Sequence, residues 1–331
     1  MNTLFSAEQL AQARDVIGAV MPPTPQYQWP LLQSRCGVEV WVKHENHTPT
    51  GAFKVRGGLV YLDGLSRSNR LPAGFITATR GNHGQSIPFA ASRHGVPVTV
   101  VVPEGNSKEK NRAMQAWGAE LIVHGRDFDE ARAEAERLAA ERQLLFAPSF
   151  HPDLVRGVAT YGMELFEAVA ELDLVYAPIG MGSGVCSLIA VRDLLGLATK
   201  IVGVVSSHAP AYALSYQQGE VVQTKEANTF ADGMACRMPN PEALDIICSG
   251  VARIVQVNDD EVANAMRVLY ADTHNVAEGA GAAAMAALLQ ELRDDGELGH
   301  ARDLRVAVIL TGGNVDSEIF ANVLQGKTPR I

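Results

Sequence analysis

The sequence has few cysteines and few aromatic residues. Its four cysteines stand at Cys36, Cys186, Cys236 and Cys248, and no two of them have Cys-x-x-Cys spacing. A zinc ribbon and a thioredoxin-type redox site are therefore not indicated. We interpret the cysteines as free thiols in a reducing compartment.

Long apolar runs and an excess of basic charge are also missing. No stretch reaches the roughly 18 apolar residues of a membrane span, and the polar N-terminus is neither a signal nor a transit peptide. The chain has 28 basic and 37 acidic residues, which gives a net charge of −9. This balance argues against nucleic acid or an anionic membrane as the main partner, although a local site can still bind an anionic small ligand. We expect a cytoplasmic protein.

The composition indicates a globular protein with a sizeable core. Of the 331 residues, 47% are hydrophobic, 20% charged and 6% aromatic, which excludes a disordered or fibrous chain. At roughly 150 residues per domain, the length predicts about two domains.

Short apolar runs alternate with helical patterns along the chain. Ser6 and Gln9 predict a capping box for a helix over 7–20. Residues 38–45, 75–80 and 96–103 are predicted strands, and 127–141 a helix with a solvated face. The stretch 207–250 is rich in proline, glycine and polar residues, so we expect it to be irregular. The alternation predicts βαβ units with parallel sheets and helices on both faces.

Glycine-containing turns follow four predicted strands, in the segments NHTPTGAFK, TRGNHG, PIGMGSG and TGGN. Ligands of open α/β sheets bind beyond the carboxyl ends of the strands. These turns are therefore the first candidates for a site.

The loop Gly180–Gly184 follows a strand and opens a helix, which suits phosphate binding by backbone N–H groups. A dinucleotide site fits less well because the spacing is G-x-G-x-x-S. In addition, Ser206 and Ser207 stand where an acidic residue would contact a ribose. Two interpretations of this loop remain. It binds a single phosphate, or it is a tight turn without a ligand.

Lys54 lies between the apolar Phe53 and Val55. Desolvation there would lower its pKa and make it a nucleophile, whereas an exposed helical lysine is the alternative. Asn82 and His83 lie in a turn that could hold a carboxylate or simply cap a helix. His44 and His47 are spaced like metal ligands but lack evident partners, so we expect no metal there.

The chain order of these turns resembles the fold-type II pyridoxal-phosphate enzymes, most closely the serine/threonine dehydratase and serine racemase family. Six segments are similar to its motifs, in order: 52–57 (AFKVRG), 79–85 (TRGNHGQ), 180–184 (GMGSG), 231–233 (ADG), 278–281 (EGAG) and 311–316 (TGGNVD). The resemblance covers nearly the whole chain.

The resemblance implies a tryptophan-synthase-β-like fold of two open, mostly parallel, twisted sheets with helices on both faces. A large cofactor domain would comprise 1–50 plus 146–331. A small domain, 51–145, would be inserted in it, with the active site in the cleft between them. By the same analogy we expect a homodimer.

The resemblance also assigns residues. The catalytic residue would be Lys54, which would carry the pyridoxal 5'-phosphate covalently. The cofactor would further contact Phe53, Asn82, Gly180, Met181, Gly182, Ser183, Gly184 and Thr311. The amino-acid substrate would contact Thr79, Arg80, Gly81, Asn82 and His83.

The implied reaction is α,β-elimination from a β-hydroxy-L-amino acid such as threonine or serine, giving a 2-oxo acid and ammonia. Thr311 would contact the ring nitrogen through a hydroxyl and not through a carboxylate. The ring would then be a weaker electron sink, which suits prompt loss of a β-leaving group. The alternatives are a 3-hydroxyaspartate-type dehydratase and a β-replacement synthase of the same fold, and the ADG and TGGN segments favour the lyase. Because this sequence ends soon after 311–316, we expect no appended regulatory domain and therefore a catabolic role.

Two departures from the family matter. Its racemases carry an acid/base serine where Arg80 stands, and a guanidinium does not release a proton at neutral pH, so racemisation is disfavoured. Some members bind a divalent cation through acidic residues after the strand that matches 201–205. Residues 206–212 (SSHAPAY) contain no carboxylate, so we expect no metal.

Overall fold

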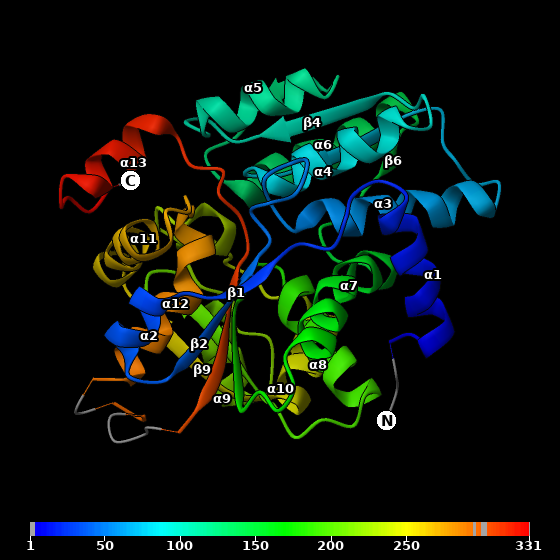
Figure 1. The fold of residues 1–331 in the computed structure, drawn as a ribbon. Helices are drawn as coiled ribbons and strands as arrows, with labels where there is room; N and C mark the ends of the chain where they lie inside the picture. The colour runs from blue at the N-terminus through cyan, green and yellow to red at the C-terminus, as the bar shows by residue number, and fades with distance from the viewer. Residues whose placement is uncertain (1–3, 294–295, 299–302, 331) are drawn as a thin grey trace.

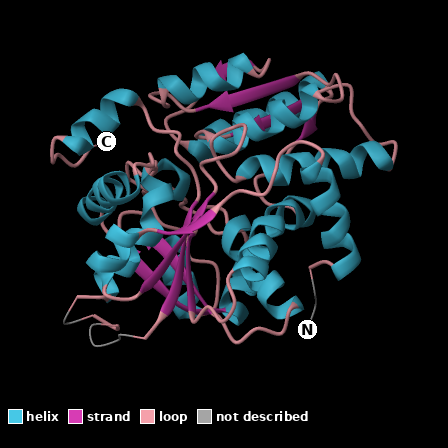
Figure 2. Cartoon of the chain, viewed as in Figure 1, coloured by secondary structure: helices cyan, strands magenta, loops and turns pink. Residues whose placement is uncertain are grey.

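The computed structural model describes residues 4–293, 296–298 and 303–330. Within this part of the chain, helices surround two twisted sheets (Figures 1 and 2). The six-stranded sheet has the order β1-β2-β10-β7-β8-β9, and the four-stranded sheet β5-β4-β3-β6. Only the pairing of β1 with β2 is antiparallel among these described strands. The expected α/β fold with two mostly parallel sheets is confirmed.

The larger sheet comprises β1 (Gln26–Gln28), β2 (Glu39–His44), β7 (Leu174–Pro178), β8 (Lys200–Ser206), β9 (Val251–Val257) and β10 (Arg305–Leu310). The smaller sheet comprises β3 (Phe75–Ala78), β4 (Val98–Val102), β5 (Glu120–Val123) and β6 (Leu145–Phe146).

Helices cover both faces of the larger sheet (Figure 1). On one side lie α2 (Pro30–Cys36), α11 (Asp259–Thr273) and α12 (Gly279–Glu291). On the other lie α7 (Pro152–Ala168), α8 (Ser183–Leu194) and α10 (Pro241–Gly250). The remaining helices are α1 (Ala7–Gly18), α3 (Lys54–Arg67), α4 (Asn82–Ser92), α5 (Lys108–Ala116), α6 (Phe128–Arg142), α9 (Ala211–Gln218) and α13 (Ser317–Leu324).

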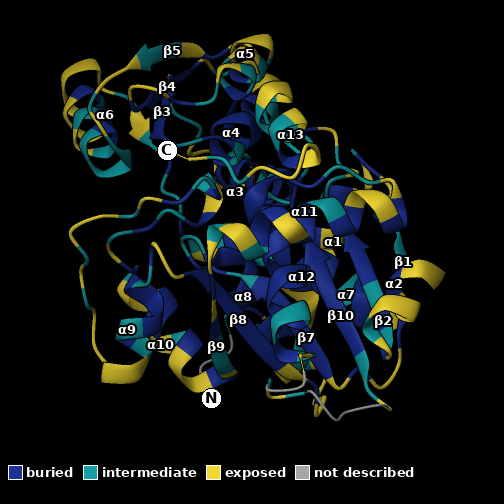
Figure 3. Ribbon diagram, turned by 90° about the vertical axis from the view of Figure 1, so that its left-hand side faces the viewer, coloured by how far each residue is buried: buried dark blue, intermediate teal, exposed yellow. Residues whose placement is uncertain are grey.

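Strand β10 shows why the sheet is covered twice. Val306 and Val308 pack into the core beneath α11 and α12, whereas Ala307 and Ile309 pack into the core beneath α7 and α8. Successive side chains of a strand point to opposite faces, so an unbroken apolar run buries both. Figure 3 shows the central strands β10, β7 and β8 of this sheet as mostly buried.

The structure corrects some expected elements. The first helix ends at Gly18 rather than at 20. The stretch 207–250 is not irregular throughout, because it contains α9, a 3₁₀ helix (Asp232–Met234) and α10. Asn240 caps α10, and Pro241 occupies its first turn, where the missing N–H costs nothing. The expected strands 38–45, 75–80 and 96–103 are confirmed as β2, β3 and β4 within shorter bounds.

The topology gathers the glycine turns in one place. β3, β7 and β10 end directly before Thr79, Ile179 and Thr311, and a backbone bridge joins Ala52 to Gly312. The carboxyl ends of strands from both sheets therefore face one cleft.

Candidate active site

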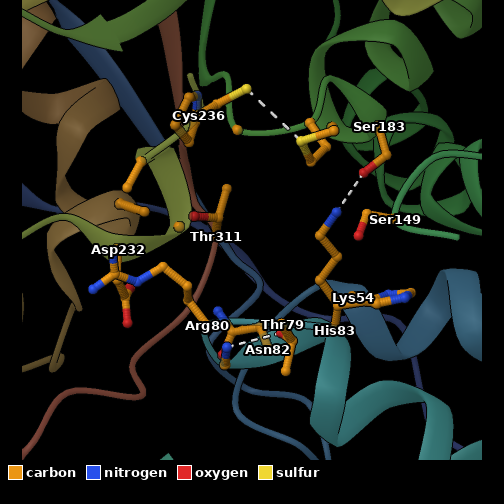
Figure 4. A pocket seen from close by; sticks show the side chains of 18 of the residues that line it. Lys54, Thr79, Arg80, Asn82, His83, Ser149, Ser183, Asp232, Cys236 and Thr311 are labelled. Carbon is orange, nitrogen blue, oxygen red and sulfur yellow. Dashed lines mark hydrogen bonds between the residues drawn. The ribbon is translucent and has the colours of Figure 1, made fainter. Parts of the chain in front are cut away.

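The cleft encloses about 850 Å³, including the part open to solvent. Figure 4 shows side chains from both sheets pointing into it. Every residue that the sequence assigned to the site lines this cavity: Phe53, Lys54, Thr79, Arg80, Gly81, Asn82, His83, Gly180, Met181, Gly182, Ser183, Gly184 and Thr311.

Lys54 is the first residue of α3, and its amine reaches across the cavity. Its Nζ donates a hydrogen bond to Ser183 Oγ at 2.7 Å and lies 5.0 Å from the centroid of the Phe53 ring. Although Lys54 is partly exposed to the cavity, the surrounding protein desolvates the amine and lowers its pKa to about 8. A lysine in this state is partly neutral at physiological pH and can act as a nucleophile or base.

The loop Gly180–Gly184 has the shape of a phosphate cradle. A Cβ at Gly180 would lie 2.1 Å from the Gly233 carbonyl oxygen, and Gly182 has a φ of +96°, so both positions need glycine. Helix α8 begins at Ser183, which leaves the N–H groups of its first turn free for an anion. The loop therefore fits the phosphate of a cofactor whose aldehyde would lie at Lys54.

The turn before α4 offers a second anion site. Thr79 Oγ1 accepts hydrogen bonds from the N–H groups of Gly81 (2.9 Å) and Gly84 (3.3 Å). In the described part of the chain, the N–H groups of Asn82 and His83 have no such partner. Burial lowers the pKa of His83 to about 3, so its ring is neutral. Two free N–H groups at a helix start suit a carboxylate.

A polar network fixes the side chain of Asn82. Its Nδ2 donates to Glu278 Oε1 at 2.5 Å, and its Oδ1 accepts from Asn314 Nδ2 at 2.9 Å. Lys110 Nζ donates to Glu278 Oε2 and to Asp232 Oδ2, both at 2.7 Å. These bonds determine which end of the Asn82 amide faces the cavity and leave its second N–H hydrogen available there.

Sequence reasoning missed several residues of the cavity wall, among them Lys110 and Phe128. Lys110 lies in a segment, 106–113, that has the composition of an exposed helix, and its partners are 122 and 168 residues away. Phe128 begins α6, whose predicted face was solvated, but its ring lines the cavity with Cys236. Arg237 pairs with Asp127 and Asp129 at 3.1 and 2.7 Å, which ties the start of α6 to the wall opposite.

The histidine pair lies elsewhere. His44 and His47 stack with their ring centroids 5.1 Å apart, and His44 Nε2 accepts a hydrogen bond from Trp29 Nε1. Within the described ranges, no group of three or more His, Cys, Asp or Glu side chains could hold a metal ion. None of the described helices is long and apolar enough to cross a membrane.

Known proteins are similar to this chain in sequence and in fold. The L-threonine ammonia-lyase of Geobacter sulfurreducens is 35% identical over 297 residues, which are 89% of this chain and 72% of the relative. The catabolic L-threonine dehydratase of Escherichia coli is 30% identical, covering 86% of this chain and 85% of the relative. The structure of threonine deaminase isoform 2 from Solanum lycopersicum superposes with a TM-score of 0.85 at 27% identity, over 98% of this chain and 95% of that one.

The family described as "Pyridoxal-phosphate dependent enzyme" matches residues 19–312. Its cofactor requires a lysine amine, a phosphate cradle and a partner for the ring nitrogen. In the cavity these are available as Lys54, the loop Gly180–Gly184 and the buried Thr311 hydroxyl. The chain belongs to this family of pyridoxal-phosphate dependent enzymes.

Proposed function

We propose that this enzyme is an ammonia-lyase that converts a β-hydroxy-L-amino acid such as threonine or serine into a 2-oxo acid and ammonia. The observation that carries the proposal is the position of the Lys54 amine between a phosphate cradle and two free N–H groups. The relatives named as threonine ammonia-lyase and threonine dehydratase support it.

In this proposal Lys54 would hold the cofactor covalently and the loop Gly180–Gly184 would bind the cofactor phosphate. Asn82 would contact the cofactor's phenolic oxygen, and Thr311 its ring nitrogen. Phe53 would pack beside the ring. When bound, pyridoxal phosphate withdraws electrons from the substrate Cα and so makes its proton acidic.

The protein's own groups bind and orient the substrate and remove its Cα proton. The N–H groups of Asn82 and His83 hold the α-carboxylate, which orients the Cα–H bond. The Lys54 Nζ removes the Cα proton, because its lowered pKa leaves it partly unprotonated at neutral pH. Because the His83 ring is neutral, it places no positive charge beside the carboxylate that these N–H groups hold.

The test is to measure 2-oxo acid and ammonia released from threonine and serine, with and without added sulfide. We expect equal amounts of 2-oxo acid and ammonia, unaffected by sulfide. A thiol amino acid formed at the expense of the 2-oxo acid would instead identify a β-replacement synthase.

We also propose a two-domain chain, 1–50 plus 146–331 with 51–145 inserted. In support, the smaller sheet spans 75–146, one residue past the proposed boundary, and the strands of the larger sheet lie on both sides of it in the sequence. The bounds at 1 and 331 lie outside the described residues. Limited proteolysis that cuts first near 50 and 146 would support the division.

A cytoplasmic homodimer is a further proposal. In support, Leu31, Tyr270 and Leu324 are exposed apolar side chains on α2, α11 and α13, which lie on the left in Figure 1. Light scattering should give twice the chain mass, and cell fractionation should place the protein in the cytosol. A dilute, fully active monomer would contradict the dimer.

Catalysis without a divalent cation is proposed as well, because residues 206–212 supply no carboxylate. Dialysis against EDTA should leave turnover unchanged. Loss of activity that magnesium restores would contradict this.

A further inference from the structure

Arg80 lies inside the candidate site without a structural partner. It follows β3, precedes the turn into α4, and lines the cavity. Its Nε is buried and has no hydrogen-bond partner among the residues that the structure describes. Across the described residues, no acidic side chain lies within 4.0 Å of its guanidinium. A permanently charged group in this position is not explained by an ion pair of the fold.

The nearby carboxylates are already engaged. Asp232 and Glu278 both accept hydrogen bonds from Lys110 Nζ. Glu278 also accepts one from Asn82. The positive charge of Arg80 is therefore left to an anion that enters the cavity.

That anion is not the cofactor phosphate. Figure 4 shows Arg80 on the Asp232 side of the cavity, whereas Ser183, at the phosphate cradle, lies across it beside the Lys54 amine. The α-carboxylate has its own donors in the N–H groups of Asn82 and His83. The guanidinium consequently remains available for a second acidic group, and its forked N–H groups match a carboxylate.

We infer that Arg80 determines specificity by binding a distal carboxylate, so that the preferred substrates are β-hydroxyamino acids with a second carboxyl group on the β-carbon, as in 3-hydroxyaspartate. This inference rests on the proposed function and narrows its substrate class. Its basis is the guanidinium of Arg80, which lines the cavity with a buried Nε that no described residue engages.

The first experiment compares kcat/KM for 3-hydroxyaspartate, threonine and serine in the wild type, in Arg80→Ser and in Arg80→Lys. The ratio of the diacid value to the threonine value should fall about 10–100-fold in Arg80→Ser, the range for a lost charge-assisted, bidentate pair. Arg80→Lys keeps the charge but not the fork and should give an intermediate ratio.

Arg93 supplies the matched control. It follows the other end of α4 and is exposed, outside the cavity. Arg93→Ser should leave the ratio unchanged. A ratio that stays within about threefold of the wild type in Arg80→Ser would overturn the inference, as would an equal loss for all three substrates.

A second measurement does not depend on elimination. L-aspartate and L-alanine have no hydroxyl leaving group, and their binding to the holoenzyme can be followed through the absorbance of the cofactor. Wild type should bind aspartate more tightly than alanine, and Arg80→Ser should lose this difference.

The two hypotheses fail separately. If none of the three hydroxyamino acids yields a 2-oxo acid, the proposed function is wrong, and the aspartate and alanine affinities still decide the role of Arg80. If threonine is turned over but Arg80→Ser does not change the preference for aspartate, the function stands and the inference fails.

Discussion

The amine of Lys54 has its pKa lowered to about 8 by desolvation, with a hydroxyl as its hydrogen-bond partner. Covalent attachment to the cofactor aldehyde requires the neutral amine. The rate at which cofactor-free protein binds pyridoxal phosphate covalently should therefore rise with pH through a midpoint near 8. Stopped-flow absorbance measures this rate, and a midpoint near the ordinary lysine value of 10.5 would contradict the assignment.

Lys54→Ala removes the same amine. We expect it to abolish turnover and the absorbance of the covalently bound cofactor, while the far-ultraviolet circular dichroism stays that of the wild type. A variant with normal turnover would show that another group is the base.

Gly182 and Gly184 make a matched pair within the cradle. A Cβ at Gly182 would lie 2.7 Å from the Ala243 Cβ, at a φ of +96°, whereas one at Gly184 would have ordinary contacts of 3.6 Å or more. Left-handed backbone costs a side chain about 1–2 kcal/mol, or roughly tenfold in affinity. Gly182→Ala should weaken cofactor affinity at least tenfold, and Gly184→Ala much less. Equilibrium dialysis compares them, and equal losses would argue against a conformational role for Gly182.

At this scale the sequence predicted the residues that carry a chemical signature. Single features suggested site residues: the glycines after strands, the lysine among apolar residues and the asparagine in a turn. The order of these features along the chain then suggested one common site. Lys110 gave no such signal, because its carboxylate partners Asp232 and Glu278 come from distant segments. Long-range ion pairs depend on the tertiary fold rather than on any local pattern.

Among the elements, β2 ends in a residue that is sensitive to acid. Desolvation and the neighbouring His47 lower the pKa of His44 to about 4, against 6.5 for an ordinary histidine. Below pH 6.5 the unfolded chain binds a proton that the folded chain refuses, so stability falls as the pH falls toward 4. Between pH 7 and 5 this histidine should cost about 2 kcal/mol of unfolding free energy.

Urea unfolding at pH 7 and 5 measures that loss. His44→Gln cannot titrate, but its amide oxygen can still accept the hydrogen bond from Trp29. The variant should therefore lose less stability than the wild type on acidification. An unchanged pH dependence would show that other groups dominate.

Helices and strands were predictable from the sequence where their apolar pattern was pronounced. β4 is a run of five buried residues and was evident. The short strand β1 has an exposed, polar pattern, so nothing in its sequence distinguished it from a loop, and its pairing with β2 defines it. Helix α10 lay in a segment whose prolines and glycines suggested irregular chain, although Pro241 in fact begins it.

At the scale of the whole molecule, polar contacts hold the two sheets' units together around the cavity. Lys110 in α5 bonds to Asp232 and Glu278. Asp316, before α13, accepts hydrogen bonds from the hydroxyl of Ser107, which caps α5, and from the first two N–H groups of α5. Arg237 adds the pairs to Asp127 and Asp129. The contacts of Asp316 and Arg237 are only partly buried, so they can break and re-form at lower cost than a buried apolar interface, which suits a cleft that must admit substrate.

Arg237 tests this view directly, because its pairs fix the start of α6 and hence the Phe128 wall of the cavity. Arg237→Met keeps the aliphatic stem but loses the charge-assisted bonds, and kcat/KM should fall about tenfold. Hydrogen exchange of the amides at 127–131 should become faster. Arg132→Met is the control, since its ion pair with Glu136 lies on the exposed face of the same helix and should affect neither quantity. If Arg237→Met slows turnover with the exchange at 127–131 unchanged, the pairs do not hold α6, and the cleft is closed by the contacts of Lys110 and Asp316 instead.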